Sequence, residues 1–483
     1  MNPADGPADE PAPPADGPAP PAFKPDTTTA EIAARWADLP PGTETDHTVA
    51  VAGRLLLRRV QGKLAFGTLD DAAGRIQLFA PAAGTPNFDD FCDRNLGDWL
   101  GVSGVVMTTR RGELSVRVDD WRLLAPALHP FPDKWHGITD PDVRFRRRYV
   151  DLWVSPDARR VFEARSAIVS LTRRRLEELA FVEVETPVFH PTPGGALARP
   201  FETRHEALGI DLYLRVATEL YLKRLVVGGF TRVFELGRVF RNEGLSTRHN
   251  PEFTMLELYE AYADYGDVMD LVEDLVAHLA REVVGDTTTT FGGRELDWTP
   301  PWPRRTMAEL VSEHAGEPLS VRTGRDRLAA AAAAADVAVE ASHGPGAILM
   351  SLYEKLVEPQ LWGPVFVTDY PVEVSPLAQR RADEPLLTER FEAVAAGREL
   401  ANGFTELTSP TEQRARFEEQ AAARAAGDDE AMAVDEDYLR ALEFGLPPTG
   451  GVGIGIDRLT MLLCDVDSIR DVLLFPTLRP EQT

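Results

Sequence analysis

The chain has 483 residues, of which 43% are hydrophobic and 27% charged, a balance that predicts about two to four globular domains and excludes a fibrous or wholly disordered protein. Its formal net charge of −26 argues against general affinity for nucleic acid, because binding to phosphate backbones relies on Lys and Arg, so any RNA contact requires a local basic face. No apolar run approaches the roughly 20 residues of a membrane span, and the N-terminus lacks the features of a secretory signal, so we expect a cytoplasmic protein without a membrane partner.

Residues 1–45 predict a disordered, Pro/Ala-rich tail with a short lead-in to the first domain. Prolines in the first 25 residues are mixed with alanine, glycine and aspartate. Such a segment cannot bury enough apolar surface to become ordered.

Short alternating apolar runs then predict a small β-barrel over residues 46–130. The expected strands are 49–55, 65–69, 76–79, 102–107 and 114–123. Five strands with turns between them, within about 80 residues, fit a barrel of the oligonucleotide-binding (OB) type. Another small barrel or a sandwich is the alternative.

Residues 131–150 form the predicted linker, and residues 151–483 predict an α+β domain. Residues 156–179 repeat apolar side chains at helical spacing and lead into the β-rich segment 181–187. Later apolar runs at 212–216, 233–240, 253–262, 365–368 and 451–456 predict strands of a sheet flanked by helices. The alanine run ending at Ala335 predicts a helical surface insertion at about 305–345.

Residues 238–259 predict a β-hairpin with a functional loop. Arg241 ends one apolar run, and Phe253 opens the next after a polar loop that contains His249. Such a hairpin can place the arginine on a phosphate, the histidine beside it and the phenylalanine under a purine ring. A hairpin with solvated charges is the alternative.

Three glutamates further along suggest cation-binding sites. Glu392 and Glu399 flank the turn-like Ala395-Ala396-Gly397, and Glu406 follows them. Phosphate-bound Mg²⁺ is usually held through one or two carboxylates, and a cationic amino-acid side chain also needs a carboxylate partner. A surface cluster of carboxylates is the alternative.

The glycine-rich segment at 451–458 does not match a dinucleotide-binding fingerprint, because Ile456 stands where the third glycine is required. Asp457 and Arg458 follow at once. The segment therefore predicts a close-packed strand or turn that presents Arg458 to a phosphate.

Taken together, these stretches resemble, in order and spacing, the three signature motifs of class II aminoacyl-tRNA synthetases. The first motif corresponds to the helix before Phe181 and to Val184-Glu185-Thr186-Pro187, the second to the Arg241 hairpin and the third to residues 451–458. The predicted barrel looks like the anticodon-binding domain of the class IIb subgroup. The resemblance implies an α+β fold, with an antiparallel-sheet catalytic domain after an N-terminal OB-fold β-barrel.

Within class IIb the chain is most similar to the lysine enzymes of bacterial type. Three stretches carry this likeness: Pro193-Gly194-Gly195-Ala196-Leu197-Ala198-Arg199-Pro200-Phe201, Glu219-Leu220-Tyr221-Leu222-Lys223-Arg224-Leu225, and Arg241-Asn242-Glu243-Gly244 leading into Arg248-His249-Asn250-Pro251-Glu252-Phe253-Thr254. The likeness runs from about Phe23 to Pro480. Family members usually begin with a charged helix, whose place is taken here by the proline-rich tail.

The resemblance implies a lysine–tRNA ligase. Such an enzyme joins L-lysine to tRNA(Lys) with ATP as substrate and Mg²⁺ as cofactor, and it is a homodimer with Pro187 at the interface position. The alternatives are lysyl transfer to a non-tRNA acceptor and a catalytically inactive RNA-binding paralogue.

The resemblance also implies roles for single residues in the nucleotide half of the site. The residues expected to bind ATP are Arg241, Glu243, His249, Asn250, Phe253 and Arg458, and three of these, Arg241, His249 and Arg458, are the expected catalytic residues. Glu392 and Glu399 are implied to bind Mg²⁺.

For the amino acid, the implied ligands are Gly195, Glu219, Glu257, Tyr259, Asn402, Phe404 and Glu406. Gly195 and Glu219 would hold the α-amino group and Asn402 the carboxylate. Glu406 and Tyr259 would receive the side-chain ammonium. In the barrel, the residues implied to read the anticodon are Arg59, Phe66, Gln77 and Glu113, with a buried phenylalanine and surface polar residues as the alternative.

Overall fold

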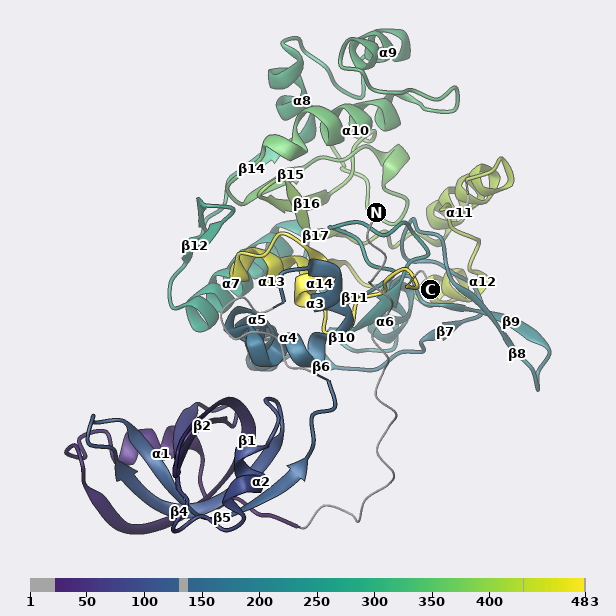
Figure 1. The fold of residues 1–483 in the computed structure, drawn as a ribbon. Helices are drawn as coiled ribbons and strands as arrows, with labels where there is room; N and C mark the ends of the chain where they lie inside the picture. Colours follow the sequence, from purple (N-terminus) through teal and green to yellow (C-terminus); the bar gives the residue numbers. More distant parts are fainter. Residues whose placement is uncertain (1–21, 130–137, 429, 482–483) are drawn as a thin grey trace, which may run out of the picture. The chain divides into compact units, whose positions relative to one another are not determined.

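The computed structural model describes residues 22–129, 138–428 and 430–481 (Figure 1). The chain divides into two compact units, residues 1–155 and 156–483. Residues 1–21 of the predicted tail and residues 130–137 around the start of the predicted linker lie outside the described residues.

The first unit is a closed five-stranded barrel with strand order β1-β2-β3-β5-β4. Its strands are β1 (Glu44–Gln61), β2 (Leu64–Asp70), β3 (Arg75–Pro81), β4 (Trp99–Thr108) and β5 (Leu114–Ala125), with the short helix α2 (Phe88–Cys92) before β4. Alternate residues such as Leu69, Ile76 and Leu78 point into its core, as the period of two predicts. The OB-type barrel is thus confirmed.

The described part of this unit contains four helices, α2 among them, that were not expected from the sequence. Helix α1 (Thr29–Arg35) begins with a capping box between Thr28 and Glu31 and buries Ile32 completely in the barrel core. The capping box was a local helix signal that the proline-rich context obscured. Helices α3 (Pro141–Arg146) and α4 (Arg148–Val154) lie at the end of the predicted linker, with Asp140 and Pro141 as cap and first residue of α3.

The second unit is built on an eight-stranded sheet, which is antiparallel except for its outermost pair at each edge. In spatial order the strands are β14 (Arg304–Thr306), β15 (Val365–Thr368), β16 (Arg390–Ala395), β17 (Arg398–Thr405), β18 (Thr449–Gly455), β11 (Glu252–Ala261), β10 (Arg232–Phe240) and β6 (Val182–Glu183). The expected α+β domain with an antiparallel sheet is confirmed.

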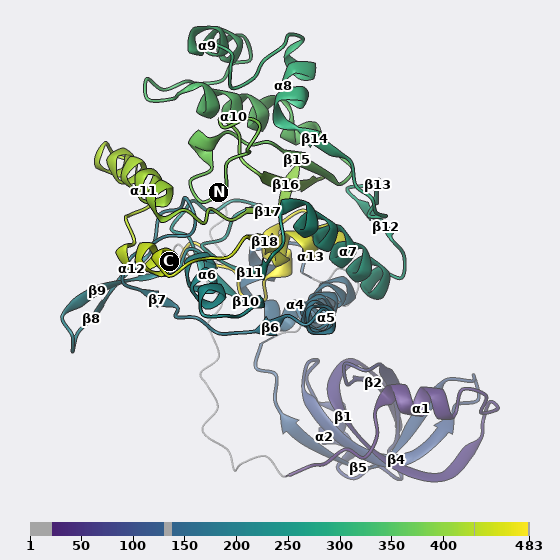
Figure 2. The ribbon, with the colours of Figure 1, turned by 180° about the vertical axis from the view of Figure 1, so that it is seen from behind.

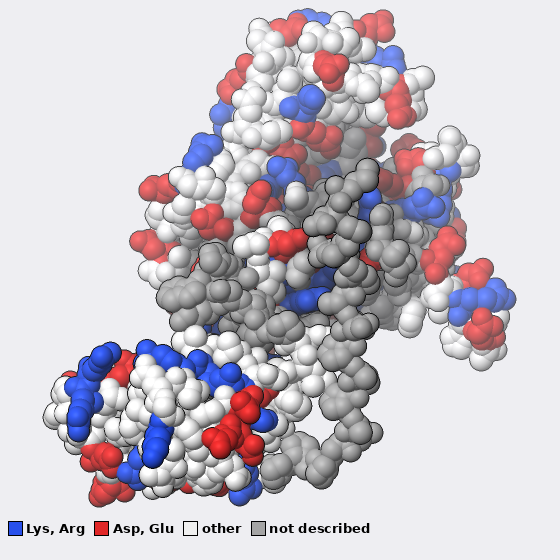
Figure 3. Space-filling view, viewed as in Figure 1, with Lys and Arg blue, Asp and Glu red and all other residues white. Residues whose placement is uncertain are grey.

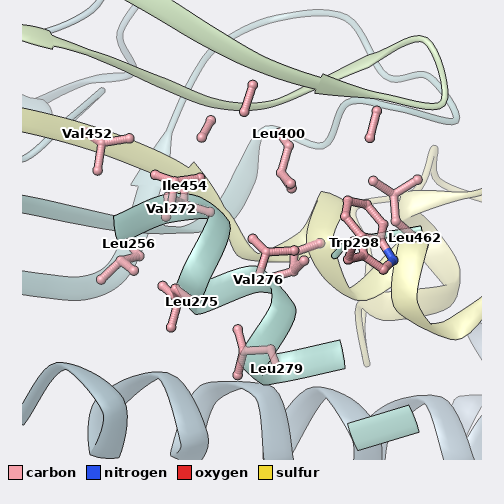
Figure 4. Close-up of a cluster of buried hydrophobic side chains, with 14 of the residues drawn as sticks. Leu256, Val272, Leu275, Val276, Leu279, Trp298, Leu400, Val452, Ile454 and Leu462 are labelled. Atoms are coloured by element: carbon pink, nitrogen blue, oxygen red, sulfur yellow. The ribbon is translucent and has the colours of Figure 1, made fainter. Parts of the chain in front are cut away.

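Helices cover both faces of this sheet. On one face α5 (Pro156–Glu178), α7 (Tyr265–Val284) and α13 (Ile456–Cys464) pack with the strands around a large apolar core (Figures 2 and 4). On the other, α6 (Glu219–Val227), α11 (Pro410–Ala425) and α12 (Glu436–Glu443) form a second cluster. The expected helix at 156–179 is present, whereas the strand after it is only two residues long.

The predicted insertion is a helical subdomain with its own core. Helices α8 (Met307–Ala315), α9 (Arg325–Ala334) and α10 (Pro345–Leu356) pack with β15 around residues such as Leu328, Ala332 and Tyr353. The third helix extends beyond the predicted end at about 345. Leu328 and Ala332 are fully buried, so the alanine-rich helix packs one side into this core and does not lie wholly on the surface.

Smaller elements complete the unit. They are a three-stranded sheet of β7 (Phe189–His190), β9 (Ile210–Leu214) and β8 (Glu202–His205), a hairpin of β12 (Thr288–Phe291) and β13 (Arg294–Asp297), the helix α14 (Ile469–Val472), and 3₁₀ turns at Glu358–Gln360 and Val372–Val374. None of the helices in the described residues is long and apolar enough to cross a membrane.

Candidate active site

One face of the central sheet forms the floor of a cavity of about 410 Å³, a size typical of ligand pockets. Side chains of a strand alternate between the two faces of a sheet. In β11, Leu256 and Leu258 therefore point into the helical core, and their neighbours point into the cavity. The cavity-facing residues of the floor are Phe253, Met255, Glu257, Tyr259, Arg390, Glu392, Asn402, Phe404, Glu406, Gly451, Gly453 and Gly455.

The same alternation explains the glycines of β18. Val452 and Ile454 fill the core on one face, and the glycines leave open space on the other. A Cβ atom at Gly451 would overlap Oε1 of Glu406 and the ring of Tyr259. Glycine is required at this position because of a close approach by two functional side chains.

The predicted hairpin is formed by β10 and β11, with Val239 opposite Phe253. Its loop brings three of the expected ATP-binding residues to one end of the cavity. The guanidinium carbon of Arg241 lies 5.1 Å from the ring centre of Phe253, and Nδ1 of His249 lies 3.0 Å from Oγ of Ser246. Burial and the nearby Arg458 lower the pKa of His249.

Two further residues of this loop line the cavity. Glu243 is exposed at its mouth. Asn250 is buried, donates to the carbonyl of Glu252 at 2.7 Å and accepts from the backbone of Thr477 at 3.3 Å. All six residues expected to bind ATP therefore line one cavity.

Arg458 and the two predicted metal ligands lie at the same end. Arg458 donates to Oε2 of Glu399 at 3.0 Å and to the carbonyl of Glu399 at 2.7 Å. Although burial acts in the opposite direction, this arginine holds the pKa of Glu399 below its usual range. Burial raises the pKa of Glu392 to about 7, against the opposing effect of Arg390.

The turn between β16 and β17 sets the spacing of this carboxylate pair. Ala396 and Gly397 at its tip both have positive φ, at 51° and 64°, as expected for a two-residue hairpin turn. The described part of the chain contains no group of three or more His, Cys, Asp or Glu able to hold a metal ion. Two cavity-lining carboxylates on strands that flank one tight turn fit a Mg²⁺ ion that takes its remaining ligands from phosphates and water.

The residues expected to bind lysine meet at the other end of the cavity. Glu406 is 1% exposed, and neither of its oxygens accepts a well-aligned hydrogen bond from the described residues. Glu257 accepts from the backbone of Thr218 at 2.9 Å and from the hydroxyl of Tyr259 at 3.2 Å. Burial and the nearby Glu219 raise the pKa of Glu257 to about 7. This end is strongly acidic.

Gly195 closes the same end with φ of 90°. A Cβ there would lie 3.1 Å from Ala217 and 3.3 Å from the Cβ of Glu219. Glycine therefore allows the loop to approach α6 closely. Phe404 also lines this end of the cavity.

Two residues of the site were missed by the sequence reasoning. Lys223 in α6 is fully buried, with its ammonium in contact with both Glu219 and Glu406. Arg390 donates to Oδ1 of Asn402 at 3.1 Å and to Glu392 at 2.7 Å. The spacing of four residues between Glu219 and Lys223 on one helix could have suggested that the two side chains interact. No local sequence feature indicates that Lys223 is buried.

The residues expected to read the anticodon lie together on the outside of the barrel. Arg59 pairs with Phe66 across β1 and β2, with its guanidinium carbon 5.2 Å from the ring centre. Gln77 donates to Oγ of Ser115 at 2.9 Å, and that hydroxyl donates to the carbonyl of Glu113 at 3.0 Å. Phe66 is only partly buried. Figure 3 shows Lys and Arg side chains gathered over part of the barrel, beside smaller acidic groups.

This fold and site define a class II tRNA synthetase with a nucleic-acid-binding barrel. Residues 140–479 match the family model described as tRNA synthetases class II (D, K and N), and residues 49–124 match that of the OB-fold nucleic acid binding domain.

Similar proteins indicate which branch of this class the chain belongs to. The chain is 54% identical to a lysine–tRNA ligase of Synechococcus sp. (strain CC9605) over 95% of this chain and 93% of the relative. It is 52% identical to a lysine–tRNA ligase of Moorella thermoacetica, over 90% and 89%. The chain belongs to the lysine–tRNA ligase family of class II tRNA synthetases.

Proposed function

We propose that this protein is a lysine–tRNA ligase, which activates L-lysine with ATP and transfers it to the 3′-terminal ribose of tRNA(Lys). The observation that carries the proposal is Glu406, a buried carboxylate on the cavity floor that shares Lys223, its one cationic partner among the described residues, with Glu219. A buried carboxylate of this kind calls for a cationic ligand. Transfer to another acceptor and an inactive paralogue find no support in the comparisons.

In this proposal the basic end of the cavity binds ATP. The guanidinium of Arg241 neutralises the α-phosphate, and Phe253 supports the purine from the floor. Arg458 binds the γ-phosphate, and His249 lies beside the phosphates with its pKa lowered. Glu243 and Asn250 complete the nucleotide end of the wall.

Glu392 and Glu399 would hold Mg²⁺ together with the phosphates. Both face the cavity from strands that flank one tight turn. The ion would offset negative charge on the phosphate oxygens. In the structure Arg458 lies 3.0 Å from Glu399, so a phosphate-bound ion and this arginine share one carboxylate.

The acidic end binds L-lysine. Glu219 and Gly195 receive the α-ammonium, and Asn402, which Arg390 orients, receives the carboxylate. Glu406 and Tyr259 receive the side-chain ammonium, while Glu257 and Phe404 complete the pocket. An amino acid without a terminal cation would leave the second oxygen of Glu406, the one not in contact with Lys223, without a partner, which is the basis of specificity.

This arrangement directs the lysine carboxylate toward the α-phosphate. A carboxylate oxygen attacks the α-phosphorus, the bond to the bridging oxygen breaks, and pyrophosphate leaves with that bond's electrons. The terminal ribose hydroxyl of tRNA then attacks the acyl carbon, and AMP leaves. Arg241 and Arg458 stabilise charge on the phosphate oxygens, so positioning and electrostatics supply the catalysis and no protein nucleophile is needed.

The outward face around Arg59, Phe66, Gln77 and Glu113 would read the anticodon. The half-buried ring of Phe66 with the guanidinium of Arg59 over it offers a stacking platform for a base, and the polar side chains offer base-edge hydrogen bonds. We expect the protein to act in the cytoplasm, where tRNA charging takes place.

A homodimer is also part of the proposal. Val182 in edge strand β6, and Val188 and Phe189 after Pro187, are apolar and 48%, 39% and 54% exposed. They lie in the first motif, where the family places its dimer interface. Pairing of two copies would cover these side chains and the free edge of β6.

The test is ATP–pyrophosphate exchange with lysine, compared with exchange when aspartate, asparagine or ornithine is supplied in its place. A Glu406→Gln variant removes the charge and keeps the size, and Glu443→Gln, which is exposed in α12, is the matched control. Exchange with lysine alone that is lost only in Glu406→Gln supports the proposal, and charging of added tRNA settles the acceptor. Absence of lysine-dependent exchange in the parent protein would refute it.

A further inference from the structure

The lysine pocket contains a cation of its own. Lys223 lies on the buried side of α6, one turn after Glu219, and its side chain is 0% exposed. Its ammonium contacts Oε1 of Glu219 and Oε2 of Glu406. It is also enclosed by aromatic rings, with the ring centres of Phe404 and Tyr438 at 5.2 and 6.0 Å.

The two carboxylate oxygens of Glu406 have different neighbours, and Lys223 contacts only one of them. Oε2 of Glu406 lies against Lys223, whereas Oε1 lies over Gly451 on the cavity floor. Lys223 thus fixes Oε2 of Glu406, and Oε1 is the oxygen on the cavity side. Aromatic rings and the helix enclose the ammonium of Lys223, whose side chain is fully buried.

The charges in the pocket support the same role. Glu219, Glu257 and Glu406 are all buried and line one end of the cavity. With a single ammonium among three carboxylates, the end carries an excess of two negative charges when all are ionised. L-lysine carries two ammonium groups. The resident cation therefore leaves a negative charge that balances the two ammonium groups of this amino acid, whose carboxylate lies outside this end of the pocket in the proposed function.

We propose that Lys223 is a positioning residue of the lysine pocket. It holds Glu406 ionised with one oxygen facing the substrate, and it leaves the pocket with a negative charge that balances two ammonium groups. This inference rests on the proposed function. Lys223 touches no expected position of the substrate directly, and acts through Glu406 and Glu219.

A pH dependence follows from the groups around Glu406. Those are Lys223 and Glu219 from α6, Glu257 and Tyr259 from β11, and Tyr438 from α12. Burial raises the pKa of Glu406, and Lys223 is the group that lowers it. Without Lys223 the pKa of the carboxyl would rise further, which favours the neutral form that cannot pair with an ammonium, and raising the pH restores its charge.

The test compares Lys223→Met with the parent protein by ATP–pyrophosphate exchange between pH 7 and 9. Lys355→Met, the same change at an exposed position of α10, is the control. We expect the KM for lysine to rise at least about 30-fold at pH 7 and to recover as the pH rises, with the KM for ATP within about twofold of the parent value. An unchanged KM for lysine, or an equal loss at every pH, would overturn the inference.

A double variant keeps the test decisive if Lys223→Met fails to fold. Removing one partner of a buried ion pair is strongly destabilising, whereas replacing both is often nearly neutral. Lys223→Met combined with Glu406→Gln removes both members of this pair and leaves only Glu219, which lines the cavity, without its cation, so the double variant should fold and should bind lysine at most about tenfold more weakly than Glu406→Gln alone. A further loss of more than about tenfold would contradict action through Glu406. If the parent protein itself gives no lysine-dependent exchange, the proposed function fails. If the parent protein shows this exchange but the Lys223 variants do not behave as expected above, only this inference fails.

Discussion

Replacing Gly451 by alanine adds one methyl group to the cavity floor. The new Cβ would lie closer than 3.0 Å to Oε1 of Glu406 and to ring carbons of Tyr259, so one of these side chains must move. Overpacking of this kind costs about 1–3 kcal/mol. If the cost falls on the lysine-bound state, it corresponds to a KM for lysine about 5- to 150-fold higher.

Alanine substitutions at two other glycines, Gly453 and Gly363, serve as controls for this experiment. A Cβ at Gly453 would meet the terminal methyl of Met255 at 2.7 Å, a flexible group that can turn away, and a Cβ at Gly363 would meet nothing within 4 Å. ATP–pyrophosphate exchange at varied lysine concentrations should therefore rank the KM for lysine as Gly451→Ala above Gly453→Ala, with Gly363→Ala at the parent value. A parental KM for lysine in Gly451→Ala would refute the assignment of Glu406 and Tyr259 to the side-chain ammonium.

Three further predictions concern the rest of the molecule. Phe66→Ala should raise the KM for tRNA by about 5- to 150-fold, the equivalent of about 1–3 kcal/mol for a stacked base, and leave pyrophosphate exchange unchanged, as comparison of the two assays would reveal. Burial raises the pKa of Glu257 to about 7 from 4.5, so the folded state binds this proton more tightly than the unfolded state. The free energy of unfolding of the ligand-free protein should therefore fall as the pH rises from about 4.5 to about 7. Thermal unfolding of Glu257→Gln should show a smaller fall over the same pH range. Glu399→Gln should raise the Mg²⁺ concentration required for exchange, and an unaltered Mg²⁺ titration would contradict a metal-binding role.

The elements that sequence predicted well are those with local patterns. The hairpin of β10 and β11 has two apolar runs separated by one polar loop, and the turn at Ala396 and Gly397 has a small residue followed by glycine between two strands. The glycines of 451–455 alternate with branched apolar residues, so the two faces of β18 can be read from the sequence once it is taken as a strand.

The features that sequence did not reveal depend on distant contacts. The spacing of Glu219 and Lys223 is typical of a solvent-exposed pair on a helix. Its burial arises only because Glu406, from a strand far along the chain, packs onto the same side of α6. Arg390 was missed for the same reason, since Asn402 becomes its partner only when β16 pairs with β17.

The cavity divides its charges along the direction of the reaction. Arg241 and Arg458 lie at one end and Glu219, Glu257 and Glu406 at the other. In the proposed function, a zwitterionic amino acid with a second ammonium is held at the acidic end by both of its cations, so its only anion faces the end that carries Arg241 and Arg458. There the carboxylate meets a phosphate whose own negative charge the arginines offset, which lowers the repulsion between two anions that must react. The alternation of β11, β17 and β18 makes this possible, because one strand face carries the charges and the other supplies the apolar core that holds them in place.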